Sequence, residues 1–477
     1  MTLSTFRDTL QSAVRDETLA DGLIGEGLAI PGLNGDVALV YADYVASGRG
    51  LRQVEDFITT HVLPFYANSH TEASFCGAYT TRLREDARDE IARLTGAGSD
   101  DVVIFAGSGA TAGLNRLVNL LGVEQASKPV VFIGPYEHHS NILPWRESRA
   151  KVVEIPEAAT GGPDLDALAQ ALNQHAGADL KIGSFSAASN VTGIITDADA
   201  VTQVLKAHGA LSVWDYAGGG PYLPIDMGAA GNTHKDAIVL SPHKFIGGPG
   251  ASGVLIVNQR AVQATCPSMP GGGTVRFVSP WRHEYLDDLV AREEAGTPNI
   301  IGDIRAALAF MVKDAVGTSM IAEREERFNQ MALNGWSDNP RLTLLGVENP
   351  HRLPIYSFLV RGHDGAPVHQ QLFTAMLSDI YGIQARGGCA CAGPYGHRLL
   401  QIDQATSEML YSQVVTNRQE VSKPGWVRLN FGYLMQDHTV QYIIDSVNEL
   451  SLATEKYAPL YQLDTATGMY HRQSQAA

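Results

Sequence analysis

Short apolar runs alternate with helical segments through the middle of this 477-residue chain. The apolar runs are expected strands, and the segments with helical periodicity between them are expected helices. This alternation predicts an α/β domain with a mainly parallel sheet. Because ligands bind beyond the carboxyl ends of strands in such sheets, the residues after each strand are the candidate site residues. The strands are expected at 102–105, 130–133, 182–185, 211–214, 237–240 and 253–257, and the helices at 110–121, 164–172, 198–208 and 300–312.

The alternation ends near residue 315, and the pattern that follows predicts a smaller α+β domain. A chain of this length is too long for one small core, so two or more domains are expected. The predicted organisation is an N-terminal arm at 1–36, a large domain at 37–312, a small C-terminal domain at 313–464 and a loose polar tail at 465–477.

Charge and composition narrow the classes of partner. The net charge of −16 disfavours nucleic acid and anionic membrane surfaces. No apolar run is long enough to span a bilayer, and the first residues lack the apolar core of a secretion signal. Four cysteines are too few and too irregularly spaced for a disulfide scaffold, which favours a cytoplasmic location.

One lysine, Lys244, lies in the Gly/Pro-rich loop 241–250 between two apolar runs. A lysine that is desolvated there has a depressed pKa and becomes a nucleophilic amine, which can form a Schiff base with a carbonyl. The alternative is a lysine that extends its ammonium group to water from a strand end.

The turns after the other strands carry further candidates. The small-residue turn 106–113 opens onto a helix and suits a phosphate, although such residues also serve tight turns. The pair His138 and His139 would stack on an aromatic cofactor, bind a metal or lie on the surface; no third ligand has the spacing for a metal site, so none is expected. Asn190 lies in a polar turn, and Asp215 is an isolated carboxylate at a strand end that a pyridinium nitrogen would neutralise.

The order of these turns resembles the fold-type I pyridoxal phosphate enzymes of the class V aminotransferase group, and within it the cysteine desulfurase and selenocysteine lyase family. The resemblance covers roughly Val37 to Leu452, and its most specific segments are 137–145, 241–244 and 295–299. It implies a large domain with a mainly parallel sheet, a smaller C-terminal domain, and pyridoxal 5′-phosphate as cofactor.

The resemblance also implies roles for individual residues. Lys244 would be the Schiff-base lysine and the acid/base, Asp215 would pair with the pyridinium nitrogen, and His138 would stack on the ring. Asn190 would lie near the ring hydroxyl and the substrate. Thr297 would reach the cofactor phosphate of a partner subunit, which implies a homodimer with shared active sites. The residues implied to hold the phosphate are Ala110, Thr111, Ser241 and His243.

The substrate end of the implied site lies further along the chain. Arg428 would clamp the substrate α-carboxylate, because a guanidinium fork matches a carboxylate. In one branch of the desulfurases an arginine precedes the sulfur-accepting cysteine by five positions, and Arg386 and Cys391 have that spacing. Cys391 is therefore the candidate nucleophile that carries the sulfur as a persulfide, with Arg386 beside the substrate. Cys389 would assist, resolve the persulfide or take no part.

Two features depart from the family pattern. Gly218 stands where the desulfurases carry a glutamine that bonds the ring oxygen, and 36 residues separate Cys391 from Arg428, a longer insertion than usual. The partly helical segment 396–421 would cover the site or shape a partner surface. The expected activity is cleavage of the C–S or C–Se bond of cysteine or selenocysteine to give alanine, with a protein as sulfur acceptor. The alternatives are another class V reaction, namely transamination, epimerisation or C–S lysis of another amino acid, or a silent scaffold.

Overall fold

The computed structural model describes residues 3–69, 72–228, 232–465 and 467–473. Its contacts divide the chain into two compact units, each built from three separate segments. The first unit comprises Met1–Ile24, Ser47–Ala188 and Ile195–Met320, and the second comprises Gly25–Ala46, Ser189–Ile194 and Ile321–Ala477. The domain boundaries drawn from the sequence stay predictions.

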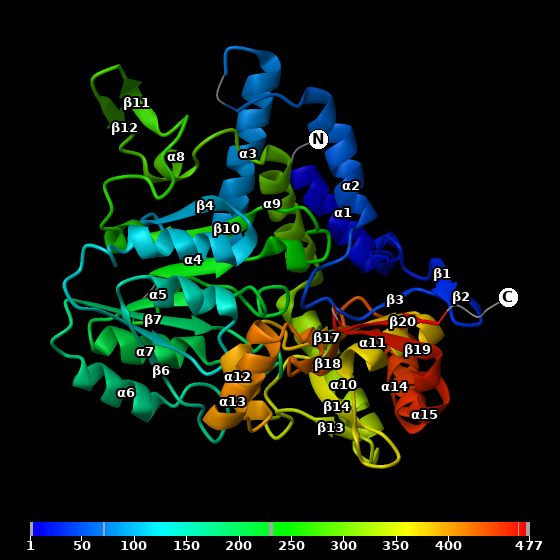
Figure 1. The fold of residues 1–477 in the computed structure, drawn as a ribbon. Coiled ribbons are helices and arrows are strands. Elements are labelled where there is room, and N and C mark those ends of the chain that lie inside the picture. Colours follow the sequence, from blue (N-terminus) through cyan, green and yellow to red (C-terminus); the bar gives the residue numbers. More distant parts are fainter. Residues whose placement is uncertain (1–2, 70–71, 229–231, 466, 474–477) are drawn as a thin grey trace. The chain divides into compact units, whose positions relative to one another are not determined.

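The first unit contains a seven-stranded sheet with the order β4-β10-β9-β8-β7-β5-β6 (Figure 1). Strands β5 to β9 run parallel to their neighbours, whereas β10 is antiparallel to both β9 and β4. The mainly parallel sheet expected from the sequence is therefore confirmed. The strands are β4 (Asp101–Gly107), β5 (Pro129–Ile133), β6 (Lys151–Glu154), β7 (Leu180–Ser186), β8 (Leu211–Asp215), β9 (Ala237–Leu240) and β10 (Gly253–Asn258).

Helices pack against this sheet through apolar faces, and some of them begin at capped N-termini. Helix α4 (Gly109–Leu120) contacts β4, β9 and β10, and its Leu114 and Leu117 join the main hydrophobic cluster. Asp164 and Asp197 cap α6 (Leu165–Gln174) and α7 (Ala198–Ala207) by accepting from backbone N–H groups three residues on. Helices α1 (Leu3–Arg15) and α3 (Phe75–Leu94) pack on α9 (Ile300–Val316), and α5 (Leu143–Glu147) packs beside β6.

One hairpin of the first unit extends away from the sheet, as Figure 1 shows. It consists of β11 (Val275–Val278) and β12 (His283–Tyr285), and Trp281 at its turn is 89% exposed. The sequence analysis made no prediction for the residues of this hairpin.

The second unit contains a five-stranded sheet in which β18 (Trp426–Asn430) lies between β14 (Ile355–Arg361) and β17 (Arg386–Gly388). Strand β13 (Leu342–Leu344) and the short β15 (Pro367–Val368) both pair with β14. Helices α10 (Thr318–Trp336), α11 (Gln370–Tyr381) and α14 (Asp437–Leu452) belong to the same region of the chain, and α11 packs on both β17 and α14. The predicted small α+β domain thus has its expected strands and helices.

Segment Gly25–Ala46 contributes to the second unit although it is remote in sequence. It forms the hairpin β1 (Ala29–Gly32) and β2 (Gly35–Ala38), followed by β3 (Val40–Tyr41). Strand β3 pairs in parallel with β16 (Ile383–Gln384), which fixes the later part of this segment beside the strand that leads into β17.

The prediction of a loose tail from residue 465 is wrong for residues 469–472. Strand β20 (Met469–Arg472) pairs antiparallel with β19 (Tyr461–Asp464). The Tyr470 ring also contacts His369, and Arg472 Nη1 donates to the Gly32 carbonyl oxygen at 2.5 Å. These contacts are remote in sequence, so the polar composition alone did not indicate them.

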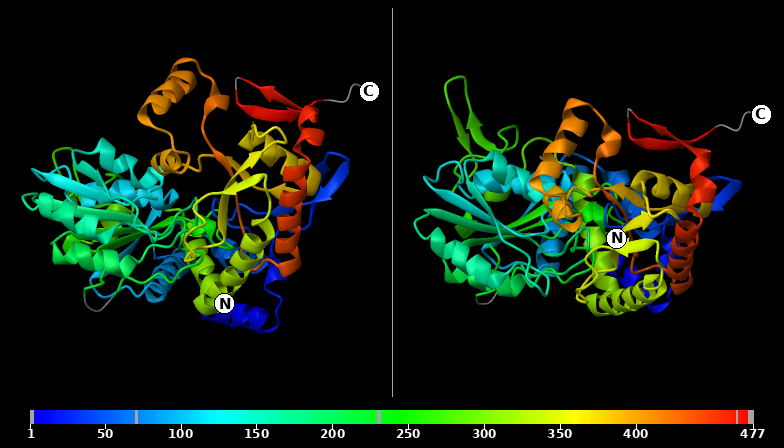
Figure 2. Two further views of the ribbon diagram at one scale, coloured as in Figure 1. Left: turned by 90° about the horizontal axis from the view of Figure 1, so that it is seen from below. Right: turned by 60° about the horizontal axis from the view of Figure 1, so that its bottom comes forward.

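The predicted helical insertion is present as α12 (Gly393–Leu399), α13 (Gln404–Tyr411) and a π-helical turn at Ser412–Thr416. No residue of α13 is buried, and Met409, Tyr411 and Val415 are exposed. Figure 2 shows this segment (orange) standing away from the sheet of its own unit. Within the described ranges, every helix is too short or too polar to cross a bilayer.

Candidate active site

The Lys244 loop connects β9 to β10, two fully buried strands, as the sequence predicted. A 3₁₀ turn at Pro242–Lys244 is closed by the Lys244 N–H, which donates to the Ser241 carbonyl oxygen at 3.0 Å. A Cβ on Gly248 would lie 1.9 Å from the Pro242 carbonyl oxygen, so only glycine fits there. The loop therefore holds a partly exposed lysine on a closely packed backbone.

The predicted phosphate residues meet at the N-terminus of α4. Ser241 Oγ accepts from the Ala110 N–H at 2.9 Å, and a Cβ on Gly109 would lie 2.9 Å from the same oxygen and 3.2 Å from His243 Cε1. Gly109 has a φ of +61°, which glycine adopts without strain. Burial, and then the Lys244 ammonium, lower the pKa of His243 to about 4, so its imidazole is neutral at pH 7. A helix N-terminus with polar side chains converging on it suits an anion.

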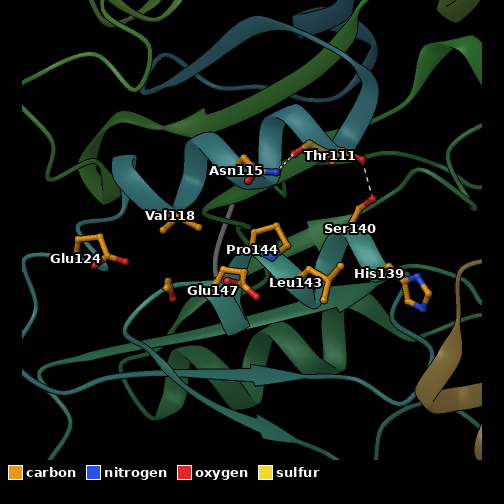
Figure 3. Close-up of a pocket in the computed structure, with 10 residues that line it drawn as sticks. Thr111, Asn115, Val118, Glu124, His139, Ser140, Leu143, Pro144 and Glu147 are labelled. Carbon is orange, nitrogen blue, oxygen red and sulfur yellow. Dashed lines mark hydrogen bonds between the residues drawn. The ribbon is translucent and has the colours of Figure 1, made fainter. Parts of the chain in front are cut away.

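Thr111 and His138 are joined through Ser140. Thr111 Oγ1 lies 2.7 Å from Ser140 Oγ, and His138 Nδ1 accepts from the Ser140 N–H at 3.1 Å. Figure 3 shows the Thr111–Ser140 pair at one end of an open cavity of about 420 Å³. The lining residues are Thr111, Asn115, Val118, Glu124, His139, Ser140, Leu143, Pro144, Glu147 and Ser148.

Asp215 lies at the carboxyl end of β8 with 4% of its surface exposed. One oxygen accepts from the Ala217 N–H at 2.7 Å. Burial raises the pKa of Asp215, while the Ala217 hydrogen bond and the Lys244 ammonium oppose that shift. The structure therefore brings Asp215 into the electrostatic range of Lys244, and the buried carboxylate still favours a further cationic partner.

Glu137 is a buried carboxylate. The sequence analysis included it in the segment 137–145 but gave it no role of its own. It accepts from Ser186 Oγ at 2.6 Å, from the Ser186 N–H at 2.9 Å and from Asn141 Nδ2 at 2.5 Å. Burial, with a smaller contribution from nearby Asp215, raises its pKa to about 7 against these hydrogen bonds. Its position in the turn after the buried strand β5 was the sequence signal that could have indicated a buried, hydrogen-bonded carboxylate.

In the second unit, Asn190 joins the cysteine turn to the buried arginine. Its Nδ2 donates to the Ala390 carbonyl oxygen at 2.8 Å, and its own carbonyl oxygen accepts from Arg428 Nη1 at 3.1 Å. Asn190 Oδ1 is buried without a hydrogen-bond partner. An unsatisfied buried oxygen is costly and marks a place for a donor from a bound molecule.

Arg428 and Arg386 both pair with one carboxylate, Asp43. Arg428 Nη2 donates to Asp43 Oδ1 at 2.8 Å, and Arg386 Nε donates to Asp43 Oδ2 at 2.9 Å. Burial lowers the pKa of Arg428, with a further contribution from Arg386, and the Asp43 carboxylate opposes that shift. Arg428 Nε is buried without a partner. The sequence reasoning did not identify Asp43, because its partners are more than 340 positions away.

Cys391 is exposed in a tight turn between β17 and α12, and Cys389 is half-buried in the same turn. The Ala392 N–H donates to the Cys389 carbonyl oxygen at 3.1 Å, and Ala390 and Cys391 have φ values of +52° and +56°. Two successive left-handed residues define a type I′ turn, which alanine and cysteine adopt only with strain. The Asn190 hydrogen bond to Ala390 holds this strained turn.

Thr297 is exposed in the segment that leads into α9 and makes no hydrogen bond to the described residues of its chain. The neighbouring Asn299 caps α9 by accepting from the Gly302 N–H at 3.2 Å. The reach of Thr297 to a partner subunit stays a prediction.

The family follows from comparison with known sequences. The sequence model described as aminotransferase class-V matches residues 40–442. The chain belongs to the class V aminotransferase family. A probable cysteine desulfurase of Vibrio cholerae is 31% identical over 365 residues, which cover 75% of this chain and 85% of that protein. A cysteine desulfurase of Escherichia coli is 29% identical over 361 residues, with the same coverage of 75% and 85%. The resemblance stated from the sequence is confirmed.

Solved structures agree in fold. A cysteine desulfurase from Thermococcus onnurineus matches with a TM-score of 0.72 and 24% identity, over 87% of this chain and 94% of that one. A cysteine desulfurase from Escherichia coli matches with a TM-score of 0.67 and 22% identity, over 86% and 94%. At these identities the structures support the fold alone, and the predicted fold class is confirmed.

Members of this family use pyridoxal phosphate, and the residues present fit that group. The buried Asp215 carboxylate favours a cation, as a protonated pyridine nitrogen would be, and the α4 N-terminus with Ser241 and His243 suits a phosphate. The open oxygen of Asn190 suits a hydroxyl donor or an ammonium group. Gly218 offers no side chain in place of the usual glutamine.

Proposed function

We propose that this chain is a pyridoxal phosphate-dependent cysteine desulfurase that converts L-cysteine, or selenocysteine, to alanine and keeps the sulfur or selenium on Cys391. The observation that carries the proposal is the exposed Cys391 in a strained turn held by Asn190, whose carbonyl oxygen also accepts from Arg428. An exposed thiol on a fixed turn is accessible as a nucleophile toward a substrate sulfur.

The proposed cofactor-holding residues belong to the first unit, except Asn190, which belongs to the second. Lys244 would hold the cofactor and move the proton at the substrate α-carbon, and Asp215 would keep the ring nitrogen protonated. His138 would lie on the ring, while Ala110, Thr111, Ser241 and His243 would hold the phosphate. Pyridoxal phosphate, when bound, withdraws electrons from the substrate α-carbon and so weakens the bonds around it.

The substrate-holding residues belong to the second unit. Arg428 and Arg386 would bind the α-carboxylate, and Asn190 would contact the substrate through its open oxygen. The Cys391 thiolate would attack the substrate sulfur. A new S–S bond forms on Cys391, the C–S bond breaks, and its electron pair stays on the substrate β-carbon, which gains a proton and becomes the alanine methyl group.

The assembly and location follow from the same proposal. A homodimer would let Thr297 reach the partner subunit's cofactor phosphate, and the persulfide would pass to a sulfur-acceptor protein. A reducing cytoplasm suits the four free thiols of the chain.

The test is turnover of L-cysteine by the holoenzyme, with alanine, sulfide and the mass of the protein measured together. Wild type is expected to form alanine and to gain the mass of one sulfur atom on Cys391. Cys391→Ala is expected to lose alanine formation by about a hundredfold or more, because the sulfur acceptor is gone. Cys266→Ala, which removes another exposed thiol, serves as the matched control. Undiminished alanine formation by Cys391→Ala would contradict the proposal and favour C–S lysis without a persulfide.

A further inference from the structure

Arg386 and Arg428 lie directly opposite each other on antiparallel strands. The register of β17 and β18 pairs these two residues at their Cα atoms. Residues paired in this way are about 4.5–5.5 Å apart at Cα and extend their side chains on the same face of the sheet. Two guanidinium groups placed so close repel each other, and like charges directly opposite destabilise a sheet. Something between them must offset this repulsion.

Asp43 occupies that place. Each of its oxygens accepts from one arginine, Oδ1 from Arg428 at 2.8 Å and Oδ2 from Arg386 at 2.9 Å. Asp43 itself is only 8% exposed. The Asp43–Arg428 pair is therefore shielded from water, where a charged hydrogen bond contributes more than it does on an open surface, whereas the Asp43–Arg386 pair is partly exposed.

The backbone around Asp43 is fixed on both sides. The Ala42 N–H donates to the Gln384 carbonyl oxygen at 3.0 Å, and the Asn430 N–H donates to the Ala42 carbonyl oxygen at 2.9 Å. On the other side, the Val45 N–H donates to Asn430 Oδ1 at 2.9 Å. The carboxylate is thus anchored to the segments that precede β17 and end β18, the same strands that carry the two arginines.

The two arginines differ in which of their guanidinium nitrogens remain accessible to a ligand. The Arg428 side chain is 4% exposed and uses both terminal nitrogens, on Asp43 and on the Asn190 carbonyl oxygen. The Arg386 side chain is 49% exposed, and its Nε alone is hydrogen-bonded among the described residues. The terminal nitrogens of Arg386 are therefore the accessible donors of this three-residue cluster, which carries a net charge of one positive unit.

We propose that Asp43 is a positioning residue for the substrate carboxylate. It neutralises one of the two facing arginines, holds Arg428 in its buried place and turns the terminal nitrogens of Arg386 outward. This inference rests on the proposed function only in requiring an α-amino carboxylate as substrate. It makes carboxylate recognition a property of the Asp43–Arg386–Arg428 cluster and not of Arg428 alone.

The test compares two ligands that differ only in the carboxylate. L-Alanine and ethylamine are titrated into holoenzyme by calorimetry, with wild type, Asp43→Asn and Asp437→Asn. Asp437 pairs with Arg324 and Arg327 in the same unit and is the matched control for the loss of an aspartate–arginine pair. Asp43→Asn is expected to weaken L-alanine binding about tenfold or more and to change ethylamine binding less than about twofold, because only the carboxylate contacts depend on the cluster. Asp437→Asn is expected to change neither.

Equal weakening of both ligands, or an L-alanine affinity that stays unchanged or rises, would overturn the proposal. If Asp43→Asn does not fold, the double variant with Arg386→Gln removes one of the two facing charges and is expected to restore folding; failure to restore it also overturns the proposal. Because these measurements need no turnover, they are independent of the desulfurase assignment. If wild type binds L-alanine but forms no alanine from L-cysteine, the proposed function is wrong. The titrations of Asp43→Asn would still decide whether Asp43 positions the carboxylate-binding arginines.

Discussion

Glu137 couples the protonation of a single buried carboxyl to the stability of the first unit. Its pKa is raised to about 7 by burial, against a usual value near 4.5. A carboxyl with a raised pKa stabilises the fold fully below its unfolded pKa, and that contribution is lost as the pH rises through the folded pKa. Glu137→Gln removes this titration. We expect the free energy of unfolding of wild type to fall by up to about 3 kcal/mol more than that of the variant between about pH 4.5 and 7.

Urea unfolding at a series of pH values measures this difference. Glu408→Gln, at an exposed glutamate of α13, controls for the loss of one surface carboxylate. Glu137→Gln also replaces one accepting oxygen by an NH₂ donor that faces Asn141 Nδ2. The free energy of unfolding of this variant is therefore expected to be lower by a constant amount of about 1–3 kcal/mol at every pH. A parallel pH dependence in wild type and Glu137→Gln would show that Glu137 stays charged.

Ala390 has a strained backbone conformation, so its replacement is expected to change the free energy of unfolding. Its φ of +52° strains an alanine but not a glycine. Ala390→Gly is therefore expected to raise the free energy of unfolding by up to about 1 kcal/mol while it loosens the turn that presents Cys391. The combination of greater stability with slower persulfide formation in a rapid-mixing experiment is the expected signature. Faster persulfide formation would mean that the strain has no part in placing the thiol.

At the scale of elements, α13 is a helix without a buried face. It contributes little to the core, and one of its side-chain contacts is Ser407 Oγ to His397 Nε2 at 3.0 Å. Replacing residues 404–416 by a short Gly/Ser linker is expected to lower the free energy of unfolding by less than about 1 kcal/mol. Alanine formation with a small reductant should stay near the wild-type rate. A loss of more than about 2 kcal/mol, measured by chemical denaturation, would show that α13 is structural.

The elements that the sequence predicted are those whose apolar patterning is local. Strands β5, β9 and β10 are nearly continuous apolar runs because both faces are buried, and such runs are visible without any tertiary information. Strands β7 and β8 are also largely buried, and their short apolar stretches were visible although serines interrupt them. Strand β6 was missed because its outer residues, Lys151 and Glu154, are exposed and polar at the sheet edge. Strand β20 was missed because its pairing with β19 depends on register.

Some residues of the candidate site were likewise predictable from local sequence, and others were not. Lys244, Asp215 and Ser241 follow strand ends and were found from the turns in which they lie. Asp43 and the pairing of Arg386 with Arg428 could not be found, because only the strand register brings these positions together. The sequence places polar residues at strand ends, but it does not say which charges face each other.

At the scale of the whole chain, one buried ion cluster joins several elements of the first unit. Glu294 accepts from Arg84 Nη2 at 2.5 Å, from Arg88 Nη1 at 2.9 Å and from the Phe105 N–H at 2.7 Å. It thereby connects α3, β4 and the segment before α9. Burial alone would raise the pKa of Glu294, but Arg88, Arg84 and the Phe105 N–H outweigh it and lower the pKa. The stability from this group is therefore present above its unfolded pKa and is lost as the pH falls.

Glu294→Gln is expected to lower the free energy of unfolding by about 3–5 kcal/mol at pH 7, because it leaves two buried guanidinium groups with too little negative charge. Asp303, which accepts from Arg84 Nε at 2.7 Å, remains as a partner of Arg84, and the half-exposed Glu85, which accepts from Arg88 Nε at 3.0 Å, remains as a partner of Arg88. Glu284→Gln, at an exposed position of β12, is the matched control and should cost less than about 0.5 kcal/mol. Because the chain runs from Glu294 through Thr297 directly into α9, the variant should also weaken the proposed dimer, measured by sedimentation equilibrium. A loss of stability below about 1 kcal/mol would mean that water or a rearranged arginine replaces the carboxylate, and that this cluster does not hold the segment that carries Thr297.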